Sequence, residues 1–227
     1  MSDASAMHDL ARLGLDQIAQ DLAMFTSVEI ALAEPLEIER TLERPRAEAG
    51  VHLSFKLSLE REQESDQLGC VLVPLPEALA LAGFLLLKTP EEVQELRKLT
   101  ELDDPLRDAM LELDNLIAGA LDNALRWFLP QGATLRAASC QGVREGARPH
   151  LPDSDPEQSY LLARSPVRIA ESEPTTWALL LPDSFKVSEE SDGAEEEAAE
   201  GEAQSSEESA PPAEDEDGER SEAAEAA

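Results

Sequence analysis

Residues 104–128 have the sequence DPLRDAMLELDNLIAGALDNALRWF, which predicts one amphipathic helix. Asp103 and Asp104 precede Pro105, an arrangement typical of a capped helix N-terminus. We expect one face of the helix to be buried against a sheet, because an apolar helix stripe is stabilised by its removal from water. The apolar residues that repeat with helical spacing are Leu106, Met110, Leu113, Ile117, Ala120, Leu121, Ala124 and Phe128.

A second stripe of the same helix is polar. Residues that step by four, three, four and three positions share one helical face, so burial of the apolar stripe would turn this row towards solvent. Its only residue without a side chain, Gly119, costs about 1 kcal/mol relative to alanine in a helix interior, and it would let another surface approach closely. The alternative is an ordinary solvated helix face. The members of the row are Asp108, Glu112, Asn115, Gly119 and Asp122.

The rest of the chain alternates between helix and strand patterns. A helix followed by a strand is expected at 7–34 and again at 104–139, which forms a weak internal repeat. This order predicts an α+β fold in which two similar halves pack their helices on one antiparallel sheet. The further helices are expected after Pro76 and at 90–99, and the further strands at 51–59, 68–75, 159–169 and 175–181.

Composition divides the chain into two parts. We expect one folded domain at 1–186 and a disordered acidic tail at 187–227, because the tail has almost no apolar side chains larger than alanine. The tail holds 17 of the 49 acidic residues and one basic residue, and the domain holds 32 acidic and 17 basic residues. This negative charge opposes binding to nucleic acids and to anionic lipid.

No targeting or membrane segment is recognisable in the sequence. The chain has no run of roughly 18 apolar residues, the length needed to span a bilayer. Its N-terminus, MSDASAMHDL, lacks the basic-then-apolar order of a signal peptide. We therefore expect a cytoplasmic protein that does not bind membranes.

The cysteines and tryptophans indicate core positions rather than sites. Cys70 and Cys140 have no CxxC spacing and no histidine nearby in sequence, so we expect buried thiols and no metal site. Trp127 and Trp177 are expected in the core, because large aromatic side chains contribute most when buried.

The polar row and its surroundings match a known motif. The pattern Asp108-x3-Glu112-x2-Asn115, which continues as NLIAG, resembles the [DS]xxxExxN motif of the CheC/CheX/FliY family of chemotaxis phosphatases. The resemblance extends over residues 7–183 and implies a CheC-like fold with a single motif copy, as in CheX-like members. One position departs from the family, whose pattern has a proline 23 residues after the asparagine, where this chain has Ala138.

The resemblance implies a phosphatase that hydrolyses the aspartyl phosphate of a CheY-like response-regulator receiver. Asn115 would hold a water molecule in line with the phosphorus, since a neutral carboxamide both donates and accepts hydrogen bonds. Glu112 would pair with the active-site lysine of the receiver. Asp108, Gly119 and Asp122 would frame the contact with this partner. The chain would need no cofactor of its own, because the receiver carries the Mg²⁺ ion.

Three further possibilities remain open at this point. The chain could be a non-catalytic adaptor that binds a receiver or a flagellar switch protein through the same helix. It could instead be a scaffold that binds through its acidic tail. CheX-like relatives form dimers through the sheet, so a homodimer is also possible, and the alternating strand around Phe55 could present the required edge.

Overall fold

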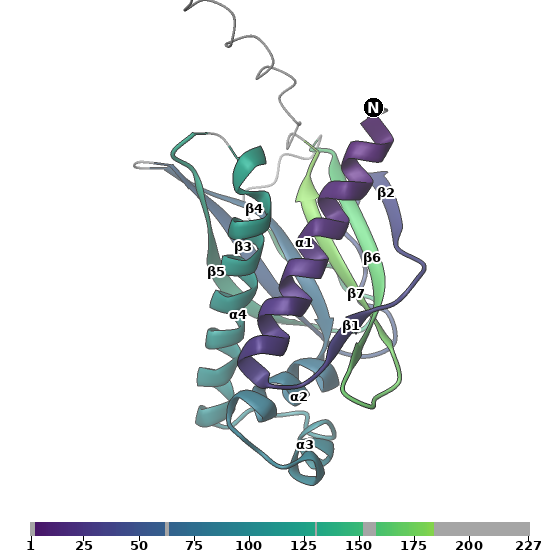
Figure 1. Ribbon diagram of the computed structural model, residues 1–227, viewed down its shortest axis with the longest axis vertical. Coiled ribbons are helices and arrows are strands. Elements are labelled where there is room, and N and C mark those ends of the chain that lie inside the picture. The colour runs from purple at the N-terminus through teal and green to yellow at the C-terminus, as the bar shows by residue number, and fades with distance from the viewer. Residues whose placement is uncertain (1–2, 62–63, 130, 152–157, 184–227) are drawn as a thin grey trace, which may run out of the picture. The chain divides into compact units, whose positions relative to one another are not determined.

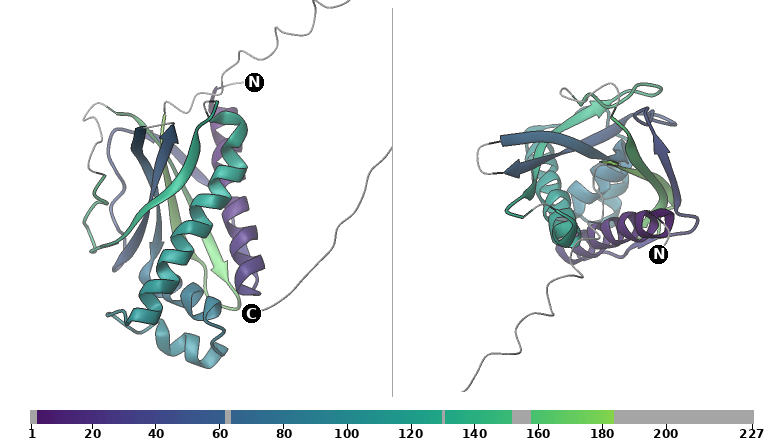
Figure 2. Two further views of the ribbon diagram at one scale, coloured as in Figure 1. Left: turned by 90° about the vertical axis from the view of Figure 1, so that its left-hand side faces the viewer. Right: turned by 90° about the horizontal axis from the view of Figure 1, so that it is seen from above.

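The computed structural model describes residues 3–61, 64–129, 131–151 and 158–183, and the expected acidic tail lies outside them (Figure 1). Two long helices, α1 (Asp3–Thr26) and α4 (Asp104–Leu125), lie side by side. Both cover the same face of one sheet, as Figure 2 shows. Two shorter helices, α2 (Leu75–Leu85) and α3 (Pro90–Leu96), lie at one end of this layer.

Within the described residues the sheet has seven strands, and all of its pairs are antiparallel. Six strands follow the order β1-β6-β7-β4-β3-β5, and β2 also pairs with β6. The α+β prediction with an antiparallel sheet is therefore confirmed. The strands are β1 (Ile30–Leu32), β2 (Glu37–Thr41), β3 (His52–Arg61), β4 (Glu64–Pro74), β5 (Thr134–Val143), β6 (Tyr160–Ile169) and β7 (Thr175–Pro182).

The strand order supports the internal repeat. Each half contributes a helix and then a first strand that pairs with the second strand of the other half: β1 and β2 pair with β6, and β5 pairs with β3. The last strands of the two halves, β4 and β7, pair in the middle of the sheet. The two halves are thus interleaved, so neither half can complete its part of the sheet alone.

Helix α4 forms as its sequence predicts. The Asp103 side chain accepts a hydrogen bond from the Leu106 N–H at 3.0 Å and caps the helix, and Pro105 occupies the first turn. Seven of the eight apolar stripe residues are buried in the core between the helices and the sheet, and Phe128 is half-buried. After Leu125 the chain tightens into a short 3₁₀ helix, η1 (Arg126–Phe128).

The two tryptophans differ in their environments. Trp177 on β7 is only 1% exposed, which confirms its predicted core position. The prediction for Trp127 is wrong, because its side chain is 92% exposed. The fully buried stripe of α4 ends at Leu125, and Trp127 follows it in η1, where the chain no longer has the α-helical spacing that defined the stripe.

The free edge of the sheet also differs from expectation. The strand around Phe55 is β3, which pairs with β4 on one side and with β5 on the other, so it presents no edge. Strand β5 forms that end of the strand order. A partner that adds a strand at this end would meet β5, because only an edge strand has unpaired backbone groups.

Candidate functional site

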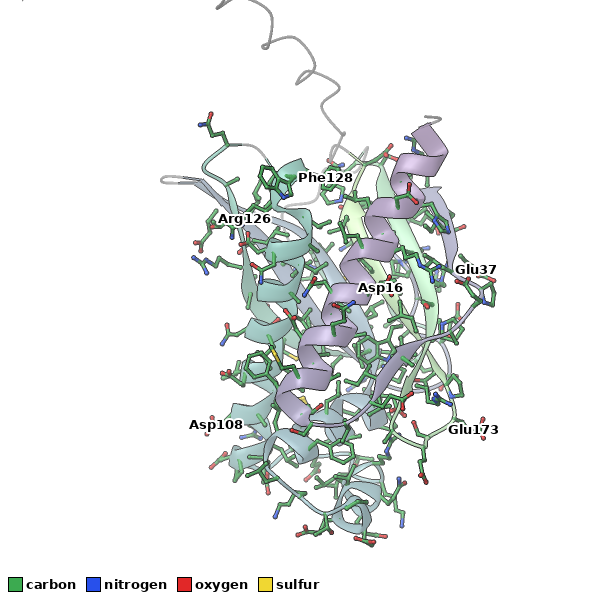
Figure 3. All side chains as sticks on the ribbon, viewed as in Figure 1. Asp16, Glu37, Asp108, Arg126, Phe128 and Glu173 are labelled. Carbon is green, nitrogen blue, oxygen red and sulfur yellow. The ribbon has the colours of Figure 1, made fainter. Side chains whose placement is uncertain are left out.

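Four residues of the predicted polar row lie on the solvent side of α4. Asp108, Glu112, Asn115 and Gly119 are all exposed. Figure 3 shows Asp108 on the outer side of the helix, away from α1. The row is exposed because the apolar stripe of α4 packs against the sheet and α1. Glu112 and Asn115 are three residues apart, so their side chains are neighbours on the helix surface.

A hollow of about 410 Å³ lies beside Asn115, between α4 and β5. Its walls include Gly119 on α4 and residues 135–137 on the edge strand β5. No atom lies within 4 Å of the position that a Gly119 side-chain methyl would take, so this part of the helix surface is open. A partner could therefore bring its backbone close to α4 here. The lining residues are Asn115, Ala118, Gly119, Asp122, Asn123, Leu135, Arg136 and Ala137.

Asp122, the fifth member of the row, is turned inward. It is only 8% exposed, so its predicted place on the solvent face is wrong. Its Oδ1 accepts a hydrogen bond from the Leu135 N–H at 2.8 Å, and its carboxylate also pairs with the guanidinium of Arg126. The edge strand β5 begins beside this turn of α4, and it covers the side chain. Asp122 thus fastens the end of α4 to β5 rather than facing a partner.

The sequence interpretation missed two residues of this region. Leu111 is 56% exposed and lies one turn before Asn115 and one turn after Asp108, so it adds an apolar contact to the row. Its spacing from Asn115 could have identified it. Asp114 is buried although it is charged in solution, and it lies four residues after Met110 and three before Ile117. Those spacings place it on the apolar stripe.

Ala138 lies at a bulge in β5. Ala137 pairs with Leu57 and Ser139 with Lys56, so Ala138 is the extra residue between them. A proline is tolerated at such a place, because the residue needs no ladder hydrogen bond. The bulge is therefore present here without the proline of the family pattern. The first half of the chain has a proline at the corresponding place. Pro35 lies ten residues after Phe25, between β1 and β2, just as Ala138 lies ten residues after Phe128.

The thiols do not contribute to this site. Burial raises the pKa of Cys70 to about 11, and burial together with the nearby Asp114 raises the pKa of Cys140 to about 12. Both are free cysteines, Cys70 buried and Cys140 half-buried. They are therefore protonated and poor nucleophiles near neutral pH.

The described residues contain neither a cluster of metal ligands nor a membrane-spanning helix. No group of three or more His, Cys, Asp or Glu residues in 3–61, 64–129, 131–151 and 158–183 lies close enough to hold a metal ion. In the same part of the chain, no helix has the length and apolar character required to cross a membrane.

Replacement of Gly119 by alanine is expected to raise the free energy of unfolding by up to about 1 kcal/mol, because alanine is the better helix former and the site is open. Chemical denaturation would measure the change. Gly83→Ala in α2 is the matched control: a methyl there would lie 2.8 Å from Leu96 Cδ1 and 3.0 Å from Val93 Cγ2, so these side chains must shift and the variant should gain less stability than Gly119→Ala. A loss of stability in Gly119→Ala would show that the helix surface is less open than described.

Comparison with known proteins identifies the fold. No protein-family model and no curated protein matches the sequence. Among solved structures, FliY from Thermotoga maritima is 12% identical, with a TM-score of 0.59 over 82% of this chain and 93% of FliY. The FliM middle domain from H. pylori is 11% identical, with a TM-score of 0.53 over 80% of this chain and 94% of that domain.

A second structure containing H. pylori FliM, a FliG–FliM complex, gives a TM-score of 0.50 at 11% identity, over 80% of this chain and 94% of the matched chain. At these identities the likeness establishes a shared fold. The chain thus has the fold of FliY, as the motif resemblance implied, and of the FliM middle domain.

Proposed function

We propose that this chain, which has the fold of FliY, is a cytoplasmic phosphatase for the aspartyl phosphate of a CheY-like receiver in chemotaxis or two-component signalling. The observation that supports this most directly is the joint exposure of Glu112 and Asn115 on one face of α4, beside an open hollow. If either side chain were buried, or if the two lay on different faces of the helix, Glu112 and Asn115 could not both reach a phosphoryl group held by another protein.

Asn115 would act on the attacking water. Its carboxamide can accept a hydrogen bond from water while carrying no negative charge toward the phosphoryl oxygens. The main requirement of phosphoryl transfer is that the nucleophile be held in line and the developing charge be balanced. In this scheme the receiver, with its Mg²⁺ ion, would balance the charge, and Asn115 on α4 would orient the water.

Glu112 would orient the complex by pairing with a cationic side chain of the receiver, the lysine beside its phosphoryl group. Such charge-assisted hydrogen bonds are stronger than neutral ones when water is excluded by the interface. Leu111 would add an apolar contact beside them, and Asp108 a further acceptor at the edge of the contact. The exposure of these side chains on one rigid helix supports this arrangement.

The experiment is to load purified receivers with acetyl phosphate, remove the donor, and follow loss of the aspartyl phosphate with and without this protein. Receivers from the source organism are the relevant panel. Accelerated decay of at least one receiver is expected. If no receiver loses its phosphate faster than it does alone, the proposal is refuted.

Glu112→Lys is expected to raise the KM for the phosphorylated receiver at least about tenfold, because it replaces an attractive ion pair with a repulsive one. The decay assay at varied receiver concentration measures this effect. Glu91→Lys on α3 is the matched control, since Glu91 is also exposed but lies on another helix. Equal KM values for the two variants would argue against a role for Glu112 in binding.

The second candidate is a non-catalytic adaptor of a flagellar switch, which the fold shared with the FliM middle domain supports. One solved structure contains that protein in a complex with FliG. The retained Asn115 favours the phosphatase, because binding alone does not require a carboxamide at this position. Stable binding of a receiver or switch protein without faster loss of phosphate would favour the adaptor.

A further inference from the structure

An acidic residue lies beneath the candidate site. Asp114 directly precedes Asn115 on α4, about 100° around the helix from it, and its side chain is only 3% exposed. Its Oδ1 atom is buried and has no hydrogen-bond partner among the described residues. A buried carboxylate without a partner is costly, so the residue favours its neutral, protonated form.

Among the described residues, no basic side chain forms an ion pair with Asp114. Helix α4 packs against α1, α2, β3 and β5. The titratable group that Asp114 influences is the thiol of Cys140 on β5, and Lys56 on β3 acts on that same thiol. No charged side chain of α1, α2, β3 or β5 contributes to the pKa of Asp114, which burial alone raises to about 7. The carboxyl group therefore changes charge near neutral pH.

We propose that Asp114 is a positioning residue for Asn115: as a neutral acid it lets the middle of α4 remain packed on β5, and its ionisation displaces this part of the helix and slows the reaction. This inference rests on the proposed phosphatase function. Displacement follows from the geometry, because an ionised carboxylate gains solvation only if the helix moves away from the strand or water enters beneath it. Asn115 is on the same helical turn and would move with it.

The direction of the pH dependence follows from the raised pKa. Below about pH 7 the folded protein holds Asp114 neutral, and the packing of α4 is intact. The contribution of neutral Asp114 to the free energy of unfolding is fully present below its ordinary pKa of 3.8. It is lost as the pH rises through the pKa of about 7 in the folded protein. The position of Asn115 in the folded state should change with a midpoint near the folded pKa.

The test compares the wild type with Asp114→Asn, which keeps the size of the side chain but cannot ionise. Between about pH 6 and about pH 8.5, the wild-type rate of receiver dephosphorylation should fall at least about threefold relative to the variant. The rate of amide hydrogen exchange in residues 110–118 is compared between the wild type and the variant at each pH. The ratio of the wild-type rate to the variant rate should rise over the same pH range. Glu91→Gln is the control and should follow the wild type.

Parallel pH profiles for the wild type and Asp114→Asn would overturn the inference. So would pH-dependent exchange in α4 without a matching change in rate. Asp114→Ala provides a second non-ionising variant if the asparagine variant does not fold, and the same outcomes apply to it. If Asn115→Ala proves fully active, the proposed function fails instead, and the pH dependence of exchange still decides whether Asp114 controls the packing of α4.

Discussion

Replacement of Asn115 by alanine is expected to lower the rate of receiver dephosphorylation by about 100-fold, which is the scale of effect when a reacting group loses its orientation. The residue has no structural task that would explain such a loss, since its side chain is exposed on α4. Binding should change little, because Glu112 and Leu111 remain. The rate is measured in single-turnover decay of the phosphorylated receiver, and binding by titration.

The same substitution two turns further along α4 is a suitable control. Asn123 is also exposed on this helix and lines the same hollow, but it lies eight residues from Asn115 and would not hold the same water molecule, so Asn123→Ala should change the rate by less than about threefold. An Asn115→Asp variant adds a test of charge, since a carboxylate would repel the phosphoryl oxygens and should be as slow as the alanine variant. Full activity in Asn115→Ala would eliminate the proposed mechanism.

Replacement of Gly69 by alanine is expected to lower the free energy of unfolding by about 3 kcal/mol or more, the range of severe overpacking. Gly69 lies on β4, and a methyl group there would lie 2.0 Å from the backbone carbonyl oxygen of Leu180 on β7. The Leu180 carbonyl belongs to the backbone of a paired strand, so it cannot relieve the clash by a change of rotamer as a side chain could. The clash falls where β4 and β7 join the two halves of the sheet.

Gly142→Ala on the edge strand β5 is the control for this prediction. No atom lies within 4 Å of the added methyl group, so the change should stay within about 0.5 kcal/mol. Denaturant titration of both variants would compare the two positions. Similar stabilities for Gly69→Ala and Gly142→Ala would contradict the close approach of β4 and β7.

Local patterns predicted most of the secondary structure and part of the site. The cap at Asp103, the apolar stripe of α4 and the exposure of Glu112 and Asn115 all depend on helical spacing within one segment. Spacing decides these features because neighbours three and four residues apart share a helix face in any helix. The motif resemblance then indicated the fold.

Long-range packing decided the rest. Asp122 continues the same spacing, yet β5 begins beside it and turns it into a buried anchor. Asp114 is polar but is buried on the inner side of α4, and Trp127 is apolar but exposed. The sequence pattern also did not predict that the first strand of each half pairs with a strand of the other half. The sequence by itself determined which helix presents the carboxamide, because periodicity is local. Only the tertiary structure decided which of its acids face solvent, because burial depends on strands distant in the chain.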